Sequence, residues 1–193
     1  MSESKRDQLI QRALTVFYKD GFHAVGMDKI AKETGVSKTA IYKHFRTKDD
    51  LILATLRLRD EQFRNWIIRR IEEFADTPAE RILASFDALE EWFLEPTFMG
   101  CMFIKAASEF QDSDSSIHAI CAEHKRILER YLIDLARQAG ARSPEQLGAQ
   151  ILLLQEGAIV VAAMMNPKKA AADAKAAAAV LLAQAMEPTS APA

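Results

Sequence analysis

The amino-acid sequence predicts an all-α protein of about nine helices. Apolar residues make up 49% of the 193-residue chain, and they recur at helical spacing over long stretches. Glycine and proline are few, at seven and six residues, and no alternation of apolar and polar residues indicates a β-strand. A chain of this length can bury a substantial core, as one domain or as two small ones.

Residues that start and stop helices divide the chain into elements. Asp49 and Asp50 favour the positive end of a long helix, whereas Pro78 and Pro144 suit the first turns of two others, and Gly140 ends a third. The predicted helices cover residues 5–19, 27–34, 38–45, 48–74, 78–94, 101–111, 116–139, 143–165 and 168–186. Residues 187–193 are expected to be a frayed tail.

Residues 27–45 contain two short helical patterns joined by a tight turn. Gly35 suits the left-handed residue that ends a helix, and Ser37 can cap the next helix by accepting a hydrogen bond from a backbone N–H. The second pattern buries Ile41 and Phe45, which are four residues apart and share a face. Two helices across a short turn, with cations on the outer face of the second, are typical of a helix-turn-helix DNA reader.

The same segment resembles the DNA-binding domain of the TetR/AcrR family of bacterial transcriptional repressors. The string GVSKTAIYKHFRTKDDL is specific to that family, and Phe17, Gly21 and Phe22 also match its pattern. The resemblance implies an N-terminal three-helix helix-turn-helix domain, residues 1–47. It further implies a C-terminal helical ligand-binding and dimerisation domain, residues 48–193.

Seven residues are predicted to contact DNA: Lys38, Thr39, Ala40, Tyr42, Lys43, His44 and Lys48. The first three open the helix that enters the major groove, so we assign them to base recognition. The next three are assigned to backbone phosphates, and the last adds a charge and a helix N-terminus for a phosphate. The alternatives are a solvated surface charge for each lysine and a packed aromatic ring for Tyr42. Asp28 stands where the family often has a basic residue, which removes a plausible phosphate contact.

The charge of the chain is unevenly distributed, although its formal net value is only −2. Residues 1–50 carry ten Lys and Arg against seven Asp and Glu, whereas the remainder carries fifteen against twenty. A basic head on an acidic body fits a DNA-binding module joined to a part that does not touch DNA. An excess of this size also arises by chance.

Neither secretion nor a membrane location is expected. The polar start MSESKRDQLIQ lacks the apolar stretch of a signal peptide. In the most apolar segment, LGAQILLLQEGAIVVAAMM, three polar residues interrupt what would be a membrane span: Gln150, Gln155 and Glu156. Cys101 and Cys121 are too few for a disulfide scaffold. We therefore expect a cytoplasmic protein.

No catalytic site, metal site or cofactor is expected. The sequence contains neither HExxH nor CxxC, and its four histidines are scattered. His118, Cys121 and His124 share one predicted helix, but their spacing places only adjacent pairs on the same face. The chain is therefore not expected to be an enzyme.

The last two predicted helices are rich in alanine with leucine, isoleucine and valine. In the TetR/AcrR family the corresponding helices usually pair with those of a second copy in a four-helix bundle, so the resemblance implies a homodimer. One DNA-reading helix also covers few base pairs, and a second copy doubles the site. The alternative is that these helices only complete the core of the monomer.

A small-molecule effector is expected in the C-terminal domain. Ligand sites are mostly apolar with a few polar anchors, although most apolar residues at helical spacing belong to a core. The candidate residues are Phe63, Trp66, Trp92, Phe103, Cys101, Glu109, Gln155 and Met164.

The function predicted from these features is that of a DNA-binding transcriptional regulator, a repressor whose operator affinity is lowered by the effector. Two alternatives stay open. Cys101 would lie at a helix N-terminus, where the dipole lowers the pKa of a thiol, and could sense electrophiles or oxidants; it could equally be a small buried hydrophobe. The protein could also be a constitutive DNA binder that takes no ligand.

Overall fold

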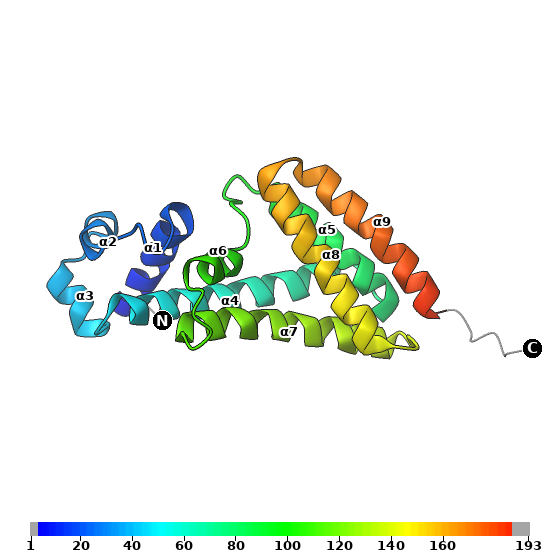
Figure 1. The fold of residues 1–193 in the computed structure, drawn as a ribbon. Coiled ribbons are helices and arrows are strands. Elements are labelled where there is room, and N and C mark those ends of the chain that lie inside the picture. Colours follow the sequence, from blue (N-terminus) through cyan, green and yellow to red (C-terminus); the bar gives the residue numbers. More distant parts are fainter. Residues whose placement is uncertain (1–3, 187–193) are drawn as a thin grey trace, which may run out of the picture. The chain divides into compact units, whose positions relative to one another are not determined.

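The computed structural model describes residues 4–186, and within that range it contains nine α-helices and no β-strand (Figure 1). The helices are α1 Lys5–Asp20, α2 Met27–Thr34, α3 Lys38–His44, α4 Lys48–Phe74, α5 Pro78–Phe93, α6 Met102–Glu109, α7 Ser116–Gln138, α8 Pro144–Met164 and α9 Pro167–Met186. The all-α prediction is confirmed, and each predicted helix is present within two residues of its expected ends. The tail expected to fray, residues 187–193, lies outside the described residues.

The helices form two compact units. Unit 1 comprises the chain up to Phe63 together with Cys101–Lys125, and unit 2 comprises Arg64–Gly100 together with the chain from Arg126 onward. The long helices α4 and α7 each contribute one part to unit 1 and the other part to unit 2. Unit 1 therefore includes more of the chain than the expected DNA-binding domain, residues 1–47, and that functional boundary stays a prediction.

Unit 1 is organised around aromatic residues at the end of α1. Phe17 and Phe22 are fully buried, and their rings stack with centroids 5.5 Å apart. Between them Gly21 adopts a φ of 82°, a conformation that suits glycine and lets the chain leave the helix. The Arg12 guanidinium donates to the Thr34 carbonyl at 2.6 Å, which ties α1 to the end of α2.

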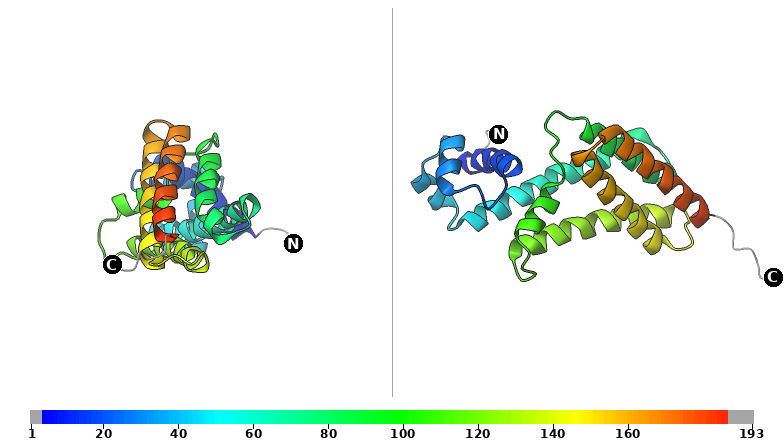
Figure 2. Two further views of the ribbon diagram at one scale, coloured as in Figure 1. Left: turned by 90° about the vertical axis from the view of Figure 1, so that its right-hand side faces the viewer. Right: turned by 45° about the horizontal axis from the view of Figure 1, so that its top comes forward.

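Unit 2 is built on α5, α8 and α9, and the last two helices lie side by side (Figure 2). α8 also approaches α7 closely at Gly148, where an added Cβ would lie only 2.8 Å from the backbone nitrogen of Ile133. Within this core the Gln155 amide donates to the Ser85 hydroxyl at 2.7 Å, so both buried polar side chains are hydrogen-bonded. α8 is long and apolar enough to cross a bilayer, but one such helix is weak evidence for a membrane protein, and one face of α8 packs in the core of unit 2.

Candidate nucleic-acid interface

Two buried side chains fix the orientation of α3. Ile41 is fully buried, and Phe45, which follows the helix, is 3% exposed. Both packing predictions are confirmed. The opposite face of α3 consequently points outward, and its exposed residues are Lys38, Thr39, Tyr42, Lys43 and His44, with Ala40 half-buried. Because the Tyr42 side chain is 47% exposed, the alternative of a packed aromatic ring does not apply within this unit.

The turn between α2 and α3 has the predicted geometry. Gly35 ends α2 with φ 67° and ψ 17°, which is the left-handed region. The Ser37 side chain accepts a hydrogen bond from the backbone N–H of Ala40 at 3.2 Å and so caps α3. The turn therefore sets the start of α3, where the predicted base-recognition residues lie.

Lys38, the first residue of α3, forms an ion pair with Asp28 of α2. Its ammonium lies 2.9 Å from Oδ1 and 3.1 Å from Oδ2 of Asp28. The hydrogen bond, together with the negative charge, raises the pKa of Lys38 above its ordinary value. This contact was not predicted from the sequence, although the opposite charges of Asp28 and Lys38 were a signal for it.

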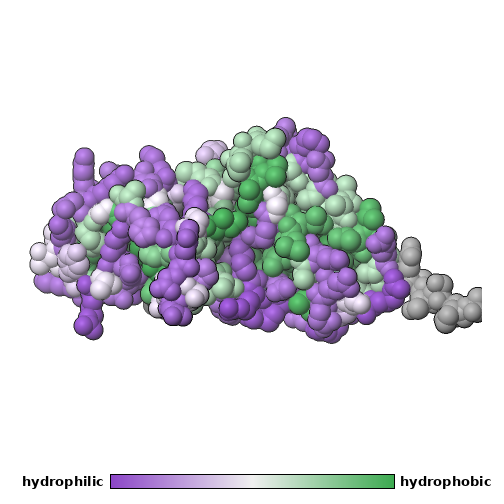
Figure 3. Space-filling model, in the orientation of Figure 1, coloured by the Kyte–Doolittle hydropathy of each residue, from purple (hydrophilic) through white to green (hydrophobic). Residues whose placement is uncertain are grey.

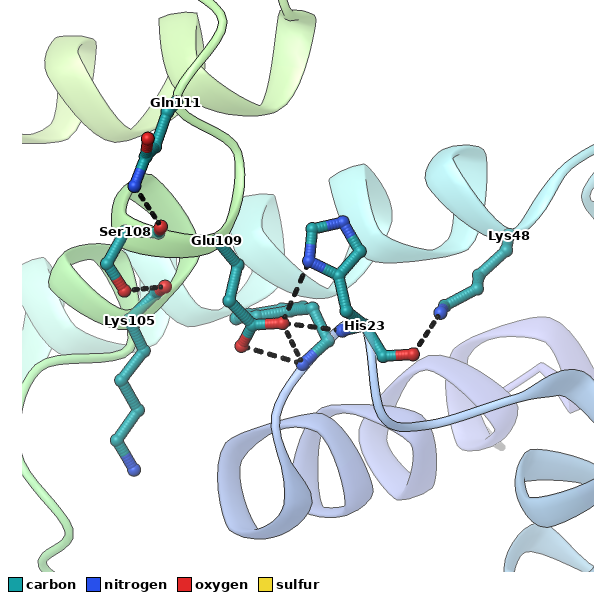
Figure 4. Close-up of polar contacts among 7 residues, drawn as sticks. His23, Lys48, Lys105, Ser108, Glu109 and Gln111 are labelled. Atoms are coloured by element: carbon teal, nitrogen blue, oxygen red, sulfur yellow. Dashed lines mark hydrogen bonds and ion pairs between the residues drawn. The ribbon is translucent and has the colours of Figure 1, made fainter.

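Glu109, at the end of α6, holds the chain that connects α1 to α2 (Figure 4). Its carboxylate accepts backbone N–H hydrogen bonds from Phe22 at 3.0 and 3.1 Å and from His23 at 2.5 Å. The His23 ring nitrogen Nδ1 lies 3.3 Å from the same carboxylate. Glu109 was expected to anchor an effector; in this structure both of its oxygens accept from backbone donors, and the effector contact stays a prediction.

Lys48 lies on the other side of the same connection. Its ammonium donates to the His23 carbonyl at 3.4 Å, and the residue is half-buried at the start of α4 (Figure 4). The peptide units of His23 therefore bridge Glu109 and Lys48. Lys105 adds a further tie between α6 and α1 by donating to the Tyr18 carbonyl at 3.2 Å, and partial burial lowers the pKa of this lysine.

Three expected effector residues are buried in unit 1, namely Phe63, Cys101 and Phe103. The Phe103 ring stacks on His124 with centroids 3.7 Å apart, and His124 Nδ1 lies 2.7 Å from Asp60 Oδ1. Cys101 precedes α6 as its N-cap, and the Lys125 ammonium donates to its sulfur at 3.5 Å. A cavity of about 270 Å³ in this unit is lined by Phe103, Ile104, Ala107, His118, Cys121, Ala122 and Lys125.

The other expected effector residues lie in unit 2. Trp92 is 4% exposed and packs edge-on against Phe98 at 4.9 Å, while Gln155 is engaged by Ser85 and Trp66 is half-buried on α4. Met164 was expected to line the effector site, but it is 77% exposed on the outer face of α8. A helix that is apolar on all sides does not indicate which face is buried, and the assignment of Met164 to an effector site stays a prediction.

Neither unit presents an obvious metal centre. Among residues 4–186, no three or more His, Cys, Asp or Glu side chains are gathered in a way that could hold a metal ion.

Comparison with known proteins supports a regulatory role. A family model described as bacterial regulatory proteins, tetR family, matches residues 9–55. The transcriptional activator FasR of Mycolicibacterium smegmatis is 33% identical over 102 residues, which cover 53% of this chain and 46% of FasR. The transcriptional repressor KstR2 of the same organism is 33% identical over 94 residues, which cover 45% of this chain and 44% of KstR2. The chain thus spans a little under half the length of these two curated relatives.

Solved structures match over most of the chain. A TetR-family transcriptional regulator from Streptomyces coelicolor superposes with a TM-score of 0.88 at 26% identity, covering 94% of this chain and 90% of that one. A TetR transcriptional regulator from Chloroflexus aurantiacus has the same fold, with a TM-score of 0.81 at 21% identity over 93% and 94% of the two chains. These relatives are regulators of transcription rather than enzymes. With the helix-turn-helix geometry of α2 and α3, these matches show that the chain belongs to the TetR/AcrR family of bacterial transcriptional regulators.

Proposed function

We propose that this chain is a cytoplasmic, homodimeric repressor that binds double-stranded operator DNA through α3. The observation that carries the proposal is the outward row of polar side chains on α3, held in place by Ile41 and Phe45 beneath it. In helix-turn-helix proteins the N-terminal residues of such a helix contact base edges. Lys38 and Thr39 then contribute to base choice, and Ala40 can contact a thymine methyl group.

The remaining contacts of the proposed interface are made with the DNA backbone. Tyr42, Lys43 and His44 lie further along the exposed face of α3, where they fit backbone phosphates. Lys48 lies at the N-terminus of α4, where its ammonium and the positive end of the helix dipole both favour a phosphate.

The proposed homodimer is supported by an apolar stripe on α8. Leu153 is 72% exposed, Val160 and Val161 are 42% and 41% exposed, and Met164 follows on the same face at helical spacing. Figure 3 shows apolar side chains gathered over α8 and α9. Contiguous exposed apolar surface of this kind marks an interaction site, and a second copy of α8 and α9 is the partner that the family resemblance implies.

The effector is proposed to be an apolar or amphipathic small molecule that binds among the helices of unit 2 that carry Trp66, Trp92 and Gln155. The effector must bind more tightly to the state of the dimer in which the two α3 helices do not fit the operator. Equal affinity for both states would leave the equilibrium between them unchanged. A coupling free energy of about 1–3 kcal/mol gives roughly a 5- to 150-fold change in operator affinity. α4 offers a continuous route for this coupling, because Trp66 and Lys48 lie on the same helix.

The test begins with mass spectrometry of small molecules that co-purify with the protein, followed by fluorescence anisotropy on an operator obtained by binding-site selection. Trp66→Ala should keep operator affinity and lose the response to the effector. Phe74→Ala, which removes an exposed aromatic ring from the same helix, should keep both. If no compound changes the operator affinity of the native protein, the chain is a constitutive DNA binder instead.

The contact between Lys125 and Cys101 favours a second candidate, a sensor of electrophiles or oxidants. Reactive cysteines occur beside cationic side chains, and the Lys125 ammonium lies within hydrogen-bond distance of the Cys101 sulfur. In that case Cys101→Ser would abolish release from DNA by N-ethylmaleimide. If the variant and the native protein respond equally, Cys101 is a packing residue, as its 7% exposure favours.

A further inference from the structure

Asp28 places a negative charge beside the proposed DNA-reading helix α3, where it opposes binding to a polyanion. It belongs to the first turn of α2, its side chain is 87% exposed, and it lies beside the N-terminus of α3. A carboxylate that faces the phosphate backbone is repelled by it. An acidic residue at this position therefore does not fit a surface that binds only phosphates.

The ion pair with Lys38 changes what both side chains can do. The Lys38 ammonium lies 2.9 Å from Asp28 Oδ1 and 3.1 Å from Oδ2, so the ion pair restricts the conformations of the Lys38 side chain. An ammonium has three N–H donors, so at least one remains for an acceptor on DNA. The carboxylate has lone pairs left as well. The pair thus presents a donor and an acceptor side by side at the start of the proposed reading helix.

A G·C base pair has the complementary pattern in the major groove. Guanine offers the acceptors O6 and N7, and cytosine offers the donor N4. O6 and N4 are hydrogen-bonded to each other within the base pair, so they lie about 2.9 Å apart, which is the usual N–H···O distance. The Lys38 Nζ to Asp28 Oδ1 distance is also 2.9 Å. The two spacings match, so the ammonium can face O6 while the carboxylate faces N4.

We propose that Asp28 and Lys38 together recognise one G·C base pair in each half-site, with Lys38 donating to guanine and Asp28 accepting from cytosine N4. The inference rests on the proposed DNA binding and adds Asp28 as a specificity-determining residue.

An A·T pair fits the same two side chains less well. Its only major-groove donor, adenine N6, lies between two acceptors, adenine N7 and thymine O4, which both repel a carboxylate. An ammonium on thymine O4 would lie next to the apolar methyl group rather than next to a second acceptor. Guanine instead offers the ammonium two adjacent acceptors, which is why the pair selects G·C.

Binding-site selection with sequencing tests the proposal on the full-length native protein and on three variants, Asp28→Asn, Asp28→Ala and Lys38→Met. The native protein should prefer G·C at one position of each half-site by about 5- to 150-fold. All three variants should lose most of that preference while the other positions of the profile persist. Thermal melting of each variant shows whether it is folded.

Salt dependence gives a second measurement on the same proteins. Removal of Asp28 frees the Lys38 ammonium to contact phosphates, so Asp28→Ala should bind unrelated DNA more tightly. The slope of log affinity against log salt should then steepen by about one. Glu33→Gln is the matched control, because it removes one exposed carboxylate from the same helix. It should leave the preference for G·C unchanged.

The outcomes separate this inference from the function on which it rests. If the native protein enriches no sequence, the proposed DNA-binding function fails. If it enriches a site whose profile is unchanged in both Asp28 variants, or in which the affected position selects A·T, the assignment of Asp28 to a G·C pair is wrong.

Discussion

Unit 1 and unit 2 differ in the kind of side chain they leave on the surface. Among the described residues, large exposed apolar side chains lie in unit 2, on α8 and α9 in particular, and Tyr42 is the exception in unit 1. Unit 1 instead exposes the cations of α3 and buries most of its aromatic residues. A surface that binds a polyanion needs charge, whereas a surface that binds a copy of itself needs apolar area. This difference supports the proposal that unit 1 binds DNA and that unit 2 binds a second copy of the chain.

The largest expected effect comes from placing a charge in the apolar stripe of unit 2. Leu153→Glu should prevent dimerisation, because a carboxylate would be buried without a partner. Operator affinity should fall on the order of 100-fold or more, since two linked reading helices gain that much from acting together. Light scattering and anisotropy measure both quantities. Asn65→Glu, which adds the same charge to an exposed face of α4, should remain a dimer; equal loss in both variants would contradict the assignment.

In unit 1 the next largest effect is expected on stability, from the loss of the contact between Glu109 and the chain that connects α1 to α2. Glu109→Ala leaves the backbone N–H groups of Phe22 and His23 without their acceptor, which should lower the free energy of unfolding by about 1–3 kcal/mol. Hydrogen exchange should show the loss at the end of α1. Ser108→Ala removes only a hydrogen bond inside α6 and should change little. Unaltered exchange at Phe22 and His23 would mean that Glu109 does not hold this connection.

A smaller effect on DNA affinity is expected from removing one lysine of unit 1, and none from removing one lysine of unit 2. Lys48→Ala should weaken binding to every DNA sequence alike and reduce the salt slope by about one, because one phosphate contact is lost. Lys168→Ala removes an exposed lysine of α9, in unit 2, and should leave the slope unchanged. Titrations at several salt concentrations measure both variants. Equal slopes for the native protein and Lys48→Ala would remove Lys48 from the proposed interface.

The smallest effect is expected at Cys121. Burial raises the pKa of its thiol from 9.0 to about 11, so the folded protein keeps this proton where the unfolded chain has lost it. The free energy of unfolding should therefore fall as the pH rises from 9 towards 11. At pH 8 iodoacetamide should label Cys121 slowly in the folded protein and quickly in guanidinium, as followed by mass spectrometry. Rapid labelling of the folded protein would show that the thiol is accessible and ionised.

The helix-turn-helix was predictable because its determinants are local. Gly35, Ser37, Ile41 and Phe45 lie within one short segment, and each acts on neighbours a few residues away. The ends of the helices were predictable for the same reason, because capping residues, glycine and proline act on the neighbouring backbone. The ion pair between Asp28 and Lys38 was also predictable. The two residues carry opposite charges, and each lies in the first turn of one of the two helices that the turn joins.

The effector residues were harder to predict because their surroundings depend on distant parts of the chain. Glu109 is engaged by Phe22, a residue 87 positions earlier, and no local pattern indicates that contact. The outward position of Met164 depends on which face of α8 packs against α5 and α9, and a helix that is apolar on all sides does not reveal this. Gln155 was correctly singled out as a polar residue on an apolar helix, but its amide is hydrogen-bonded to Ser85 within the core.

We propose that two copies of this chain place their α3 helices on one DNA duplex. Native mass spectrometry, with duplexes that carry one or two copies of the selected half-site, tests it directly. We predict two chains on the duplex with two half-sites, whose centres lie about 34–36 Å apart or slightly more, and binding on the order of 100-fold weaker to the single half-site. One chain bound tightly to a duplex with a single half-site would contradict the account.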